Sequence, residues 1–373
     1  MKILFACGGT AGHINPGLSV AAAIRQRYPD AVIRFAGNPD GMEARLVPAA
    51  GFDFVPFRAM GIQRRLTPYN IYRNFKSVGL LLTAERRAAK VIEAFEPDIV
   101  VGTGGYVSGP IVLKAAKLGI KAVTQEQNAF PGVTTKLLAK HVDKVLLAVE
   151  KAKEYLPEGA KWTVTGNPVR PDVLTASRPE ARSRMGIPDN QLCLLSFGGS
   201  LGAQRVNEAV ADVMAWHAAS GQIRHIHATG QYGVELLPRL LEERKVDYKS
   251  NPNLDIREYI DDMPACLAAA DLVICRAGAI TLSELQAAGR ASILIPSPNV
   301  AENHQYHNAM VLVDRGAALI LEEKDLTGQK LTGMVRELAR DRDRLRLLGE
   351  NAKKMAITDA NDKIVREIMA LLR

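Results

Sequence analysis

The sequence has few aromatic residues, few cysteines and no long apolar run, and each shortage excludes a class of protein. With 5% aromatic residues among 373, it offers few of the stacking platforms that nucleic-acid-binding proteins use. Its cysteines are scattered without a C-x-x-C pair, which argues against a disulfide scaffold or a zinc site. No stretch is long enough to span a bilayer, and the apolar run at Lys2–Cys7 is too short for a signal peptide. We therefore expect a cytosolic protein with reduced thiols, or one bound to a membrane from the cytosolic side.

Two nucleotide-binding fingerprints are also missing. The chain has neither the dinucleotide pattern G-x-G-x-x-G after its first strand nor a P-loop with its lysine, which disfavours a hydride-transfer enzyme and an NTPase. Asp261-Asp262 does not form a D-x-D metal motif, and we predict no metal and no cofactor. What the chain does have is a net charge of +8, which favours an anionic partner such as a nucleotide, a nucleic acid or an anionic membrane.

Short apolar strands alternate with helical segments along the whole chain, a pattern typical of doubly wound α/β domains with parallel sheets. A chain of 373 residues is expected to form two such domains. Gly166–Pro171, with two prolines and a glycine, is the predicted linker, so the domains are expected at 1–165 and 166–356. In the first domain we predict a strand at Lys2–Cys7, a turn at Gly8–His13 and a helix at Pro16–Tyr28.

The two halves repeat one local motif, G-G-[ST]-x-G, directly after the first strand of each domain. It occurs at Gly8–Gly12 and again at Gly198–Gly202, and a helix is predicted behind both copies. Glycine lets the backbone approach a ligand closely, and the hydroxyl adds a donor. Because both loops follow strands, we expect them to line an interdomain cleft that binds a small molecule.

A second phosphate-binding feature is predicted at Leu272–Leu285. An apolar strand is followed by a turn and by a helix over Ala279–Ala288, and a helix that begins beyond a parallel strand points its free N–H groups at the crevice above the sheet. Glu284 lies one turn after Thr281, where its carboxylate could hold a ribose. The alternative is that Thr281 and Glu284 form a capping box and bind no ligand.

Several motifs fall in one order along essentially the whole chain, and together they resemble the MurG family of N-acetylglucosaminyltransferases: Gly8–His13, Gly104–Pro110, Glu126–Asn128, Gly166–Arg170, Gly198–Ala203, Cys275–Glu284 and Asn303–Gln305. The resemblance implies a GT-B fold, with two Rossmann-like, doubly wound domains facing across a cleft. It also implies an inverting, metal-independent enzyme of peptidoglycan synthesis. Such an enzyme moves N-acetylglucosamine from UDP-GlcNAc to the C4 hydroxyl of the muramoyl sugar of undecaprenyl-pyrophosphoryl-MurNAc-pentapeptide (lipid I), giving lipid II.

The same resemblance implies how the domains share the substrates. The first domain, with a final helix at about 357–373, would bind the acceptor and the membrane, and 166–356 would bind UDP-GlcNAc. In the second domain Arg170 and the backbone of Ile260 would meet the nucleotide, and Ser200 the diphosphate. Glu284 would hold the ribose and Gln305 the sugar hydroxyls. The start of the Ala279 helix would meet the phosphates, through Ala279, Ile280, Thr281, Leu282 and Ser283.

The first-domain residues Thr10, Ala11, Gly12 and Asn128 would face the transferred sugar and the acceptor. The family loop is often T-G-G-H, whereas this chain has Ala11 at the second position. His13 is our candidate general base, because neutral imidazole titrates near the working pH. Its alternative role is to orient the diphosphate or cap the helix behind it. Glu126 is the second candidate base, and its alternative role is to brace its loop.

A basic and apolar stretch in the first half suggests contact with an anionic membrane, which a polyprenyl-linked acceptor would require. Its expected membrane-contacting residues are Ile71, Arg73, Phe75, Lys76 and Leu81. The alternative is an ordinary amphipathic helix that packs on its own sheet. With this stretch, the enzyme would be peripheral on the cytoplasmic face of the cell membrane.

Other functions and sites remain to be weighed. The same fold could serve a UDP-GlcNAc 2-epimerase or a diacylglycerol glycosyltransferase, and the basic charge alone suggests a nucleic-acid-binding protein, although we expect no nucleic acid as partner. His304 and His307 could bind a metal but lack a completing ligand, so we expect them on a helix surface. His225 and His227 alternate along one strand and are expected at a domain surface.

Overall fold

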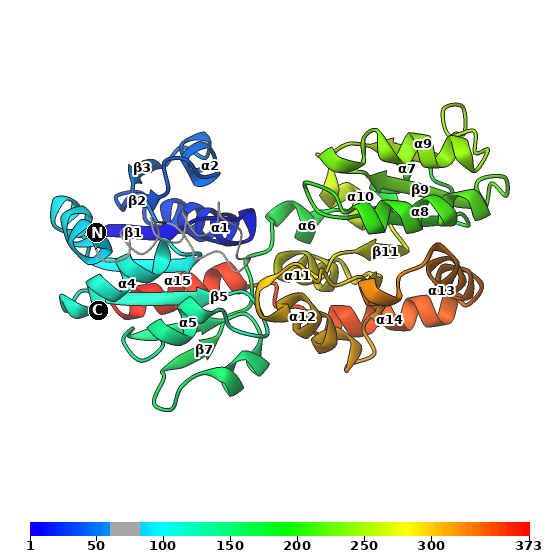
Figure 1. Cartoon of the computed structure of the whole chain (residues 1–373). Helices are drawn as coiled ribbons and strands as arrows, with labels where there is room; N and C mark the ends of the chain where they lie inside the picture. Colours follow the sequence, from blue (N-terminus) through cyan, green and yellow to red (C-terminus); the bar gives the residue numbers. More distant parts are fainter. Residues whose placement is uncertain (60–82) are drawn as a thin grey trace. The chain divides into compact units, whose positions relative to one another are not determined.

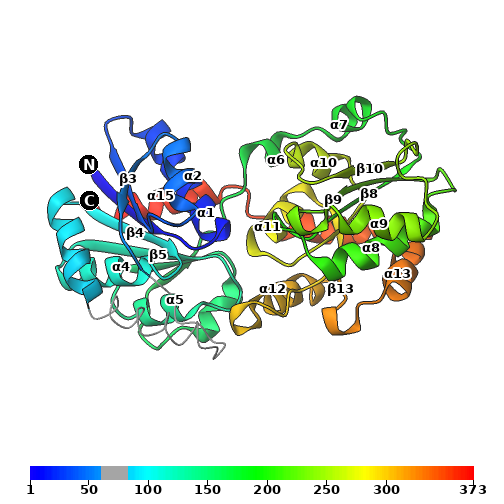
Figure 2. The ribbon, with the colours of Figure 1, turned by 45° about the horizontal axis from the view of Figure 1, so that its top comes forward.

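The computed structural model describes residues 1–59 and 83–373, which form two compact units (Figures 1 and 2). The first unit comprises Met1–Pro168 together with Asp359–Arg373, and the second comprises Val169–Thr358. The chain therefore leaves the first unit inside the predicted linker Gly166–Pro171 and returns to it for its last helix.

The first unit is built on a parallel sheet of seven strands in the order β3-β2-β1-β4-β5-β6-β7. The strands are β1 (Lys2–Cys7), β2 (Val32–Gly37), β3 (Asp53–Pro56), β4 (Ile99–Gly104), β5 (Lys121–Glu126), β6 (Lys144–Leu147) and β7 (Trp162–Val164). The helices are α1 (Ala11–Arg27), α2 (Glu43–Ala49), a helix over 83–95, α4 (Ser108–Lys117), α5 (Val133–Leu138), the 3₁₀ helix Glu150–Tyr155 and α15 (Ala360–Ala370).

The second unit repeats this plan with six parallel strands in the order β10-β9-β8-β11-β12-β13. The strands are β8 (Leu192–Phe197), β9 (Ile223–Ala228), β10 (Leu254–Arg257), β11 (Leu272–Cys275), β12 (Ala291–Leu294) and β13 (Leu319–Ile320). The α-helices are α6 (Pro171–Thr175), α7 (Arg178–Arg184), α8 (Gln204–His217), α9 (Leu236–Glu243), α10 (Met263–Ala269), α11 (Ala279–Ala288), α12 (His304–Val313), α13 (Gly328–Arg340) and α14 (Arg342–Lys354). Three 3₁₀ helices lie at Gln231–Gly233, Ala301–Asn303 and Glu323–Asp325.

Both sheets reverse their strand order at one point, and these points locate the ligand-binding crevices. The reversal lies between β1 and β4 in the first unit and between β8 and β11 in the second. In open parallel sheets, ligands bind beyond the carboxyl ends of the strands at such switch points. The loops after these four strands are therefore the expected ligand-binding loops, and both G-G-[ST]-x-G motifs lie in them.

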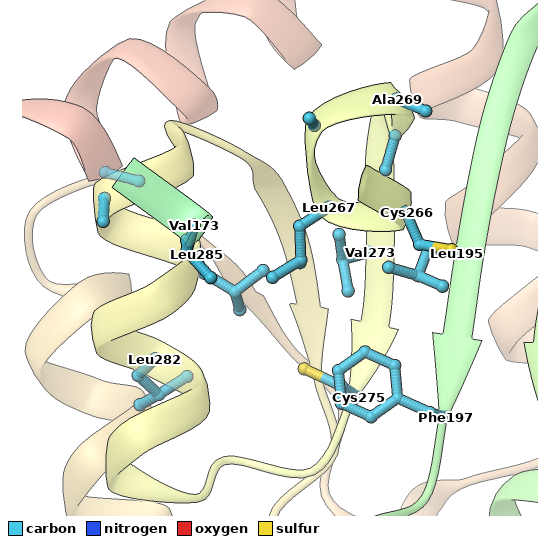
Figure 3. Close-up of a cluster of buried hydrophobic side chains, with 14 of the residues drawn as sticks. Val173, Leu195, Phe197, Cys266, Leu267, Ala269, Val273, Cys275, Leu282 and Leu285 are labelled. Carbon is cyan, nitrogen blue, oxygen red and sulfur yellow. The ribbon is translucent and has the colours of Figure 1, made fainter. Parts of the chain in front are cut away.

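The core of the second unit holds β11 and α11 in place (Figure 3). Phe197 of β8, Cys275 of β11 and Leu282 of α11 pack in one buried cluster, which also includes residues of α10 and α6. All four cysteines are buried and free, and burial raises the pKa of each thiol to about 12. At neutral pH these thiols are therefore protonated packing groups.

Helix α1 begins earlier than predicted. The prediction placed Pro16 near the first turn, but α1 starts at Ala11 and carries Pro16 in its interior. The price is one backbone hydrogen bond, since Pro16 has no N–H to donate to the Gly12 carbonyl. His13 is consequently a residue of the first helical turn, where its backbone N–H donates to the carbonyl of Thr10 at 3.0 Å, and the predicted turn ends at Thr10.

The prediction for His225 and His227 is wrong. Both side chains are completely buried, because β9 is an interior strand and its face is covered by α8. In the part of the chain that the structure describes, no helix combines the length and apolarity that crossing a bilayer requires.

Candidate active site

In the first unit, two glycine-rich turns meet beyond the carboxyl ends of β1 and β4. A Cβ on Gly105 would lie 2.1 Å from the carbonyl oxygen of Gly8, so only glycine lets the turns approach this closely. Gly104 and Gly105 also have φ values of +106° and +80°, which other residues disfavour. This packing fixes the start of α1, with Thr10 as its N-cap, at the switch point of the sheet.

The ring of His13 is held in one tautomer by its neighbours. Its Nδ1 lies 3.2 Å from the carbonyl oxygen of Gly8 and 3.2 Å from the hydroxyl of Thr10. A carbonyl can only accept, so Nδ1 carries the proton and Nε2 keeps the lone pair that a general base needs. Burial lowers the pKa of His13 below its usual 6.5, and nearby Glu126 partly opposes this shift. The imidazole is therefore neutral at pH 7.

Glu126 is buried at the end of β5, and its carboxylate is fully engaged. Oε1 accepts from the backbone N and the side-chain Nδ2 of Asn128, at 3.0 and 2.9 Å. Oε2 accepts from the backbone N of Gly132 at 3.0 Å and from Thr135 Oγ1 at 2.5 Å. A carboxylate has about four lone-pair positions, and these four donors fill them. The contacts favour the bracing role of Glu126 over the role of base, and they fix Asn128.

In the second unit, the loop Gly198–Gly202 follows β8 and packs against the backbone after β9. A Cβ on Gly202 would lie 2.2 Å from the carbonyl oxygen of Thr229, so this contact also requires glycine. Ser200 is exposed within the loop, where its hydroxyl is accessible to a ligand.

Helix α11 begins at Ala279, as predicted, and its N-terminus carries no side-chain cap. The N-cap is Gly278, and the first N–H bonded within the helix is that of Leu282, which donates to the Gly278 carbonyl at 3.0 Å. The preceding N–H groups are available by helix geometry, and the helix dipole favours an anion there. Thr281 is the third residue of the helix, so the capping-box alternative, which requires Thr281 at the N-cap, is wrong.

The remaining predicted residues of the second unit lie around this helix. Arg170, the N-cap of α6, donates from Nε to Oε1 of Glu284 at 2.8 Å. Ile260 is buried with Leu282 in one core cluster, where its side chain serves packing. Gln305 accepts from the Ser297 backbone N at 2.9 Å through Oε1, which leaves its Nε2 as a donor. Ser283 Oγ donates back to the Ala279 carbonyl at 3.1 Å.

Sequence reasoning missed Glu43, the acidic residue under the first glycine loop. Glu43 is 1% exposed, and its carboxylate accepts from the backbone N of Gly9 at 3.3 Å and of Asn38 at 2.9 Å. A Cβ on Gly8 or Gly41 would lie within 2.5 Å of a Glu43 oxygen. The only sequence signal is a cluster of glycines in distant loops, which carries no motif of its own.

Other predicted positions form no site in the described residues. The membrane-contacting residues Ile71, Arg73, Phe75, Lys76 and Leu81 lie outside the residues that the structure describes. Within 1–59 and 83–373, no three histidine, cysteine or acidic residues are arranged to hold a metal ion. Asp262 forms an ion pair with Arg257 at 2.7 Å.

Comparison with known proteins places these features in a family. The N-terminal domain of glycosyltransferase family 28 matches residues 3–147, and its C-terminal domain matches residues 193–365. A protein of Acetivibrio thermocellus, named UDP-N-acetylglucosamine–N-acetylmuramyl-(pentapeptide) pyrophosphoryl-undecaprenol N-acetylglucosamine transferase, is 42% identical over 100% of this chain and 99% of its own length.

Solved structures agree with this match. The crystal structure of Acinetobacter baumannii MurG has a TM-score of 0.76 and 29% identity, and covers 99% of each chain. The UDP-GlcNAc 2-epimerase of Neisseria meningitidis, with a TM-score of 0.64 over 99% of this chain and 100% of its own, is 14% identical and shows the fold alone. The predicted GT-B fold class is confirmed, and the chain belongs to glycosyltransferase family 28 and, within it, to the MurG family of N-acetylglucosamine transferases.

Proposed function

We propose that this chain transfers N-acetylglucosamine from UDP-GlcNAc to the C4 hydroxyl of the muramoyl sugar of lipid I, and so produces lipid II for peptidoglycan. The observation that carries this proposal is the 42% identity to a transferase of that name over the full length of both chains. The loops at the two switch points carry groups that suit such a transfer, which supports the proposal.

In the first unit, His13 is the proposed base. Its Nε2 lone pair takes the proton of the C4 hydroxyl as the oxygen attacks the anomeric carbon of the donor. The bond from that carbon to the diphosphate oxygen breaks in the same displacement, which inverts the configuration. Nδ1 stays bonded at Gly8, so the ring keeps its orientation while it gains charge. Glu126 acts through its loop, because its oxygens already hold Asn128 and the start of α5.

In the second unit, the proposed site holds UDP and stabilises it as it leaves. The free N–H groups at the start of α11 and the hydroxyl of Ser200 face the charge that develops on the diphosphate. Glu284 would hold the ribose with the carboxylate oxygen that Arg170 leaves unused, and the Nη groups of Arg170 would meet the nucleotide. Gln305 would donate from Nε2 to a sugar hydroxyl.

The test is incubation with labelled UDP-GlcNAc, with and without a soluble lipid I analogue. We expect release of UDP that requires the acceptor, and a β-linked disaccharide product. Formation of a 2-epimer without acceptor would favour an epimerase, and transfer to diacylglycerol would favour the other transferase. Either outcome would overturn the proposal, as would binding of nucleic acid with no response to UDP.

A surface of the first unit supports binding to an anionic membrane. A cavity of about 450 Å³ there is lined mainly by apolar side chains, together with Arg87, Lys114, Lys117 and His141. The acidic residue in its lining, Glu85, is paired with Lys117 at 3.3 Å and with Lys114 at 3.7 Å. Leu137, which also lines the cavity, is 68% exposed, a high fraction for a leucine. An apolar surface rimmed by basic groups suits the interface of an anionic bilayer.

Vesicle flotation tests this binding to an anionic membrane. Vesicles that contain phosphatidylglycerol should float the protein, and neutral phosphatidylcholine vesicles should not. Leu137→Asp should weaken flotation, whereas Val32→Asp, at another exposed apolar position of the same unit, should leave it unchanged. Equal flotation of both variants would exclude this surface.

A further inference from the structure

Five buried polar side chains form a continuous hydrogen-bonded chain through the second unit. They come from β8, β9 and α8, and each is at most 2% exposed. In order, His217 Nε2 lies 3.0 Å from His225 Nδ1, His225 Nε2 lies 2.7 Å from Ser196 Oγ, Ser196 Oγ lies 2.7 Å from His227 Nδ1, and His227 Nε2 lies 3.2 Å from Asn207 Oδ1. The proposed transfer uses none of these side chains.

The direction of every bond in this chain follows from its last member. Asn207 Nδ2 donates to the backbone carbonyl of Thr229 at 2.9 Å. A carbonyl can only accept, so the amide cannot be flipped, and Asn207 Oδ1 must accept from His227. His227 therefore carries its proton on Nε2, and its Nδ1 accepts from the hydroxyl of Ser196.

The same logic fixes the other two histidines. Because the Ser196 hydrogen points to His227, its oxygen accepts from Nε2–H of His225. Nδ1 of His225 then accepts from Nε2–H of His217, whose own Nδ1 is buried with no partner in the described structure. Burial lowers the pKa of all three rings far enough that they stay neutral at pH 7. All hydrogen bonds thus point one way, toward Thr229.

The hydrogen-bonded chain of side chains ends at Thr229, and the backbone of Thr229 contacts the glycine loop Gly198–Gly202. A Cβ on Gly202 would lie 2.2 Å from the Thr229 carbonyl oxygen, and one on Gly230 would lie 2.1 Å from the Gly202 nitrogen. The backbone of the loop therefore rests directly on the backbone of Thr229 and Gly230. A shift of the Thr229 carbonyl would move the loop, since no side chain lies between them to absorb it.

We propose that Asn207 and His227 are positioning residues for the glycine loop: they hold the Thr229 carbonyl and so set where the loop and Ser200 meet the donor diphosphate. This inference rests on the proposed function, because it assigns the loop to UDP-GlcNAc. It adds that donor affinity depends on a hydrogen-bonded chain that makes no contact with the donor.

Two substitutions of one residue separate positioning from packing. In His227→Gln the amide nitrogen can replace Nε2 as donor to Asn207, whereas in His227→Asn the shorter side chain can replace only Nδ1. We expect His227→Asn and Asn207→Ala to raise the Kd for UDP and the KM for UDP-GlcNAc about tenfold, the effect of one lost buried hydrogen bond. The KM for the acceptor should stay unchanged. In His227→Gln, the Kd for UDP and the KM for UDP-GlcNAc should stay within about twofold of the values of the unsubstituted protein.

Val210→Ala is the control, because Val210 is fully buried on the same helix and takes no part in the chain. It should lower the Tm and leave the Kd for UDP unchanged. Hydrogen exchange of amides 199–203 gives a readout without nucleotide, and it should be faster in His227→Asn than in His227→Gln.

Equal UDP affinity and equal exchange in the Gln and Asn variants would overturn the inference, as would an equal loss of affinity in Val210→Ala. If exchange differs as expected but Ser200→Ala leaves UDP affinity unchanged, the loop is positioned as inferred and its assignment to the donor fails instead.

Discussion

Arg170 and Glu284, separated by 114 positions in the sequence, form an ion pair of 2.8 Å that joins the start of α6 to α11. Glu284 is 8% exposed, so its carboxylate depends on this partner for much of its solvation. The pair orients both side chains in the absence of a ligand, and it leaves one oxygen of Glu284 and both Nη groups of Arg170 available. Pre-ordered groups lose less entropy when a ligand binds.

We expect Glu284→Ala to weaken UDP binding by about ten- to a hundredfold, which corresponds to the loss of a charge-assisted hydrogen bond and of the orientation of Arg170. Titration calorimetry with UDP would measure this. The matched control is Glu350→Ala, which removes the acid of a 2.7 Å ion pair on α14 and should not change UDP affinity. Unchanged UDP affinity in Glu284→Ala would show that Glu284 does not bind the ribose.

The pH dependence of transfer tests His13 as the base. A base must be unprotonated to act, so activity should fall with decreasing pH only when His13 becomes protonated. Because burial lowers the pKa of His13 below its usual range, kcat/KM should stay flat through neutral pH and decline only at a lower pH than an ordinary histidine would give. His13→Asn, which can still donate to the Gly8 carbonyl, should reduce kcat by about 10²- to 10⁴-fold and abolish the acidic limb. A variant that keeps this limb would rule out His13 as its source.

Glu126→Gln separates the bracing role from that of a base. Replacing one carboxylate oxygen by an NH₂ group places a hydrogen-bond donor opposite neighbours that are donors themselves. We therefore expect the free energy of unfolding to fall by about 2–4 kcal/mol. Urea unfolding would measure this loss, and the pH profile of the remaining activity should keep its shape. A base would give the opposite result, with stability retained and the acidic limb lost.

We expect Glu43 to affect the acceptor site of the first unit and not the affinity for UDP. Glu43→Ala leaves the backbone N–H groups of Gly9 and Asn38 without their acceptor, and we expect it to lower kcat and to cost about 2–4 kcal/mol of stability. UDP affinity should stay unchanged, because the proposed nucleotide site belongs to the other unit. Steady-state kinetics would measure kcat, and titration calorimetry would measure the affinity for UDP. A loss of UDP affinity would contradict the assignment of Glu43 to the acceptor site alone.

The buried histidines predict acid sensitivity of the fold. Burial lowers the pKa of His217 to about 4, of His227 to about 3, and of His225 well below 6.5. Below about pH 6.5 the unfolded chain therefore binds more protons than the folded chain, and the free energy of unfolding falls. At pH 5.5 the loss is about 1.4 kcal/mol per histidine, or roughly 4 kcal/mol for the three.

Urea unfolding at pH 7.5 and 5.5 would measure this loss. His217→Gln should reduce the loss by about a third, and the exposed control His141→Gln should not change it. Identical pH dependence of all three proteins would mean that the buried histidines do not cause it.

The parts of the fold that sequence reasoning predicted well are those in which local signals agree. The helix Ala279–Ala288 has the predicted bounds, and the apolar strand predicted before it is β11, because an apolar β-branched run, a glycine turn and a helical spacing follow one another directly. The predicted start of α1 was wrong because proline favours the first turn of a helix, which led us to place Pro16 there. Only the packing of Gly8 against Gly105 shows that the helix begins earlier.

The buried polar groups could not be predicted in this way. The partners of His225 are Ser196 and His217, which lie on another strand and on a helix, so a local pattern of alternating histidines has no means of showing them. Glu43 is similar, since its acceptor role depends on loops that meet only in the folded unit. Long-range hydrogen bonds of this kind are satisfied by tertiary structure, and local sequence periodicity does not record them.

The return of α15 to the first unit has a consequence for synthesis on the ribosome. Ile364 and Ile368 lie in the same buried cluster as Phe5 of β1, so this core of the first unit cannot be completed before α15 has been translated. The intervening unit has all of its own residues by Thr358 and can fold first. A nascent chain therefore exposes an apolar strip beside α1 until α15 has been made, and a chain that stopped before α15 would leave this strip uncovered.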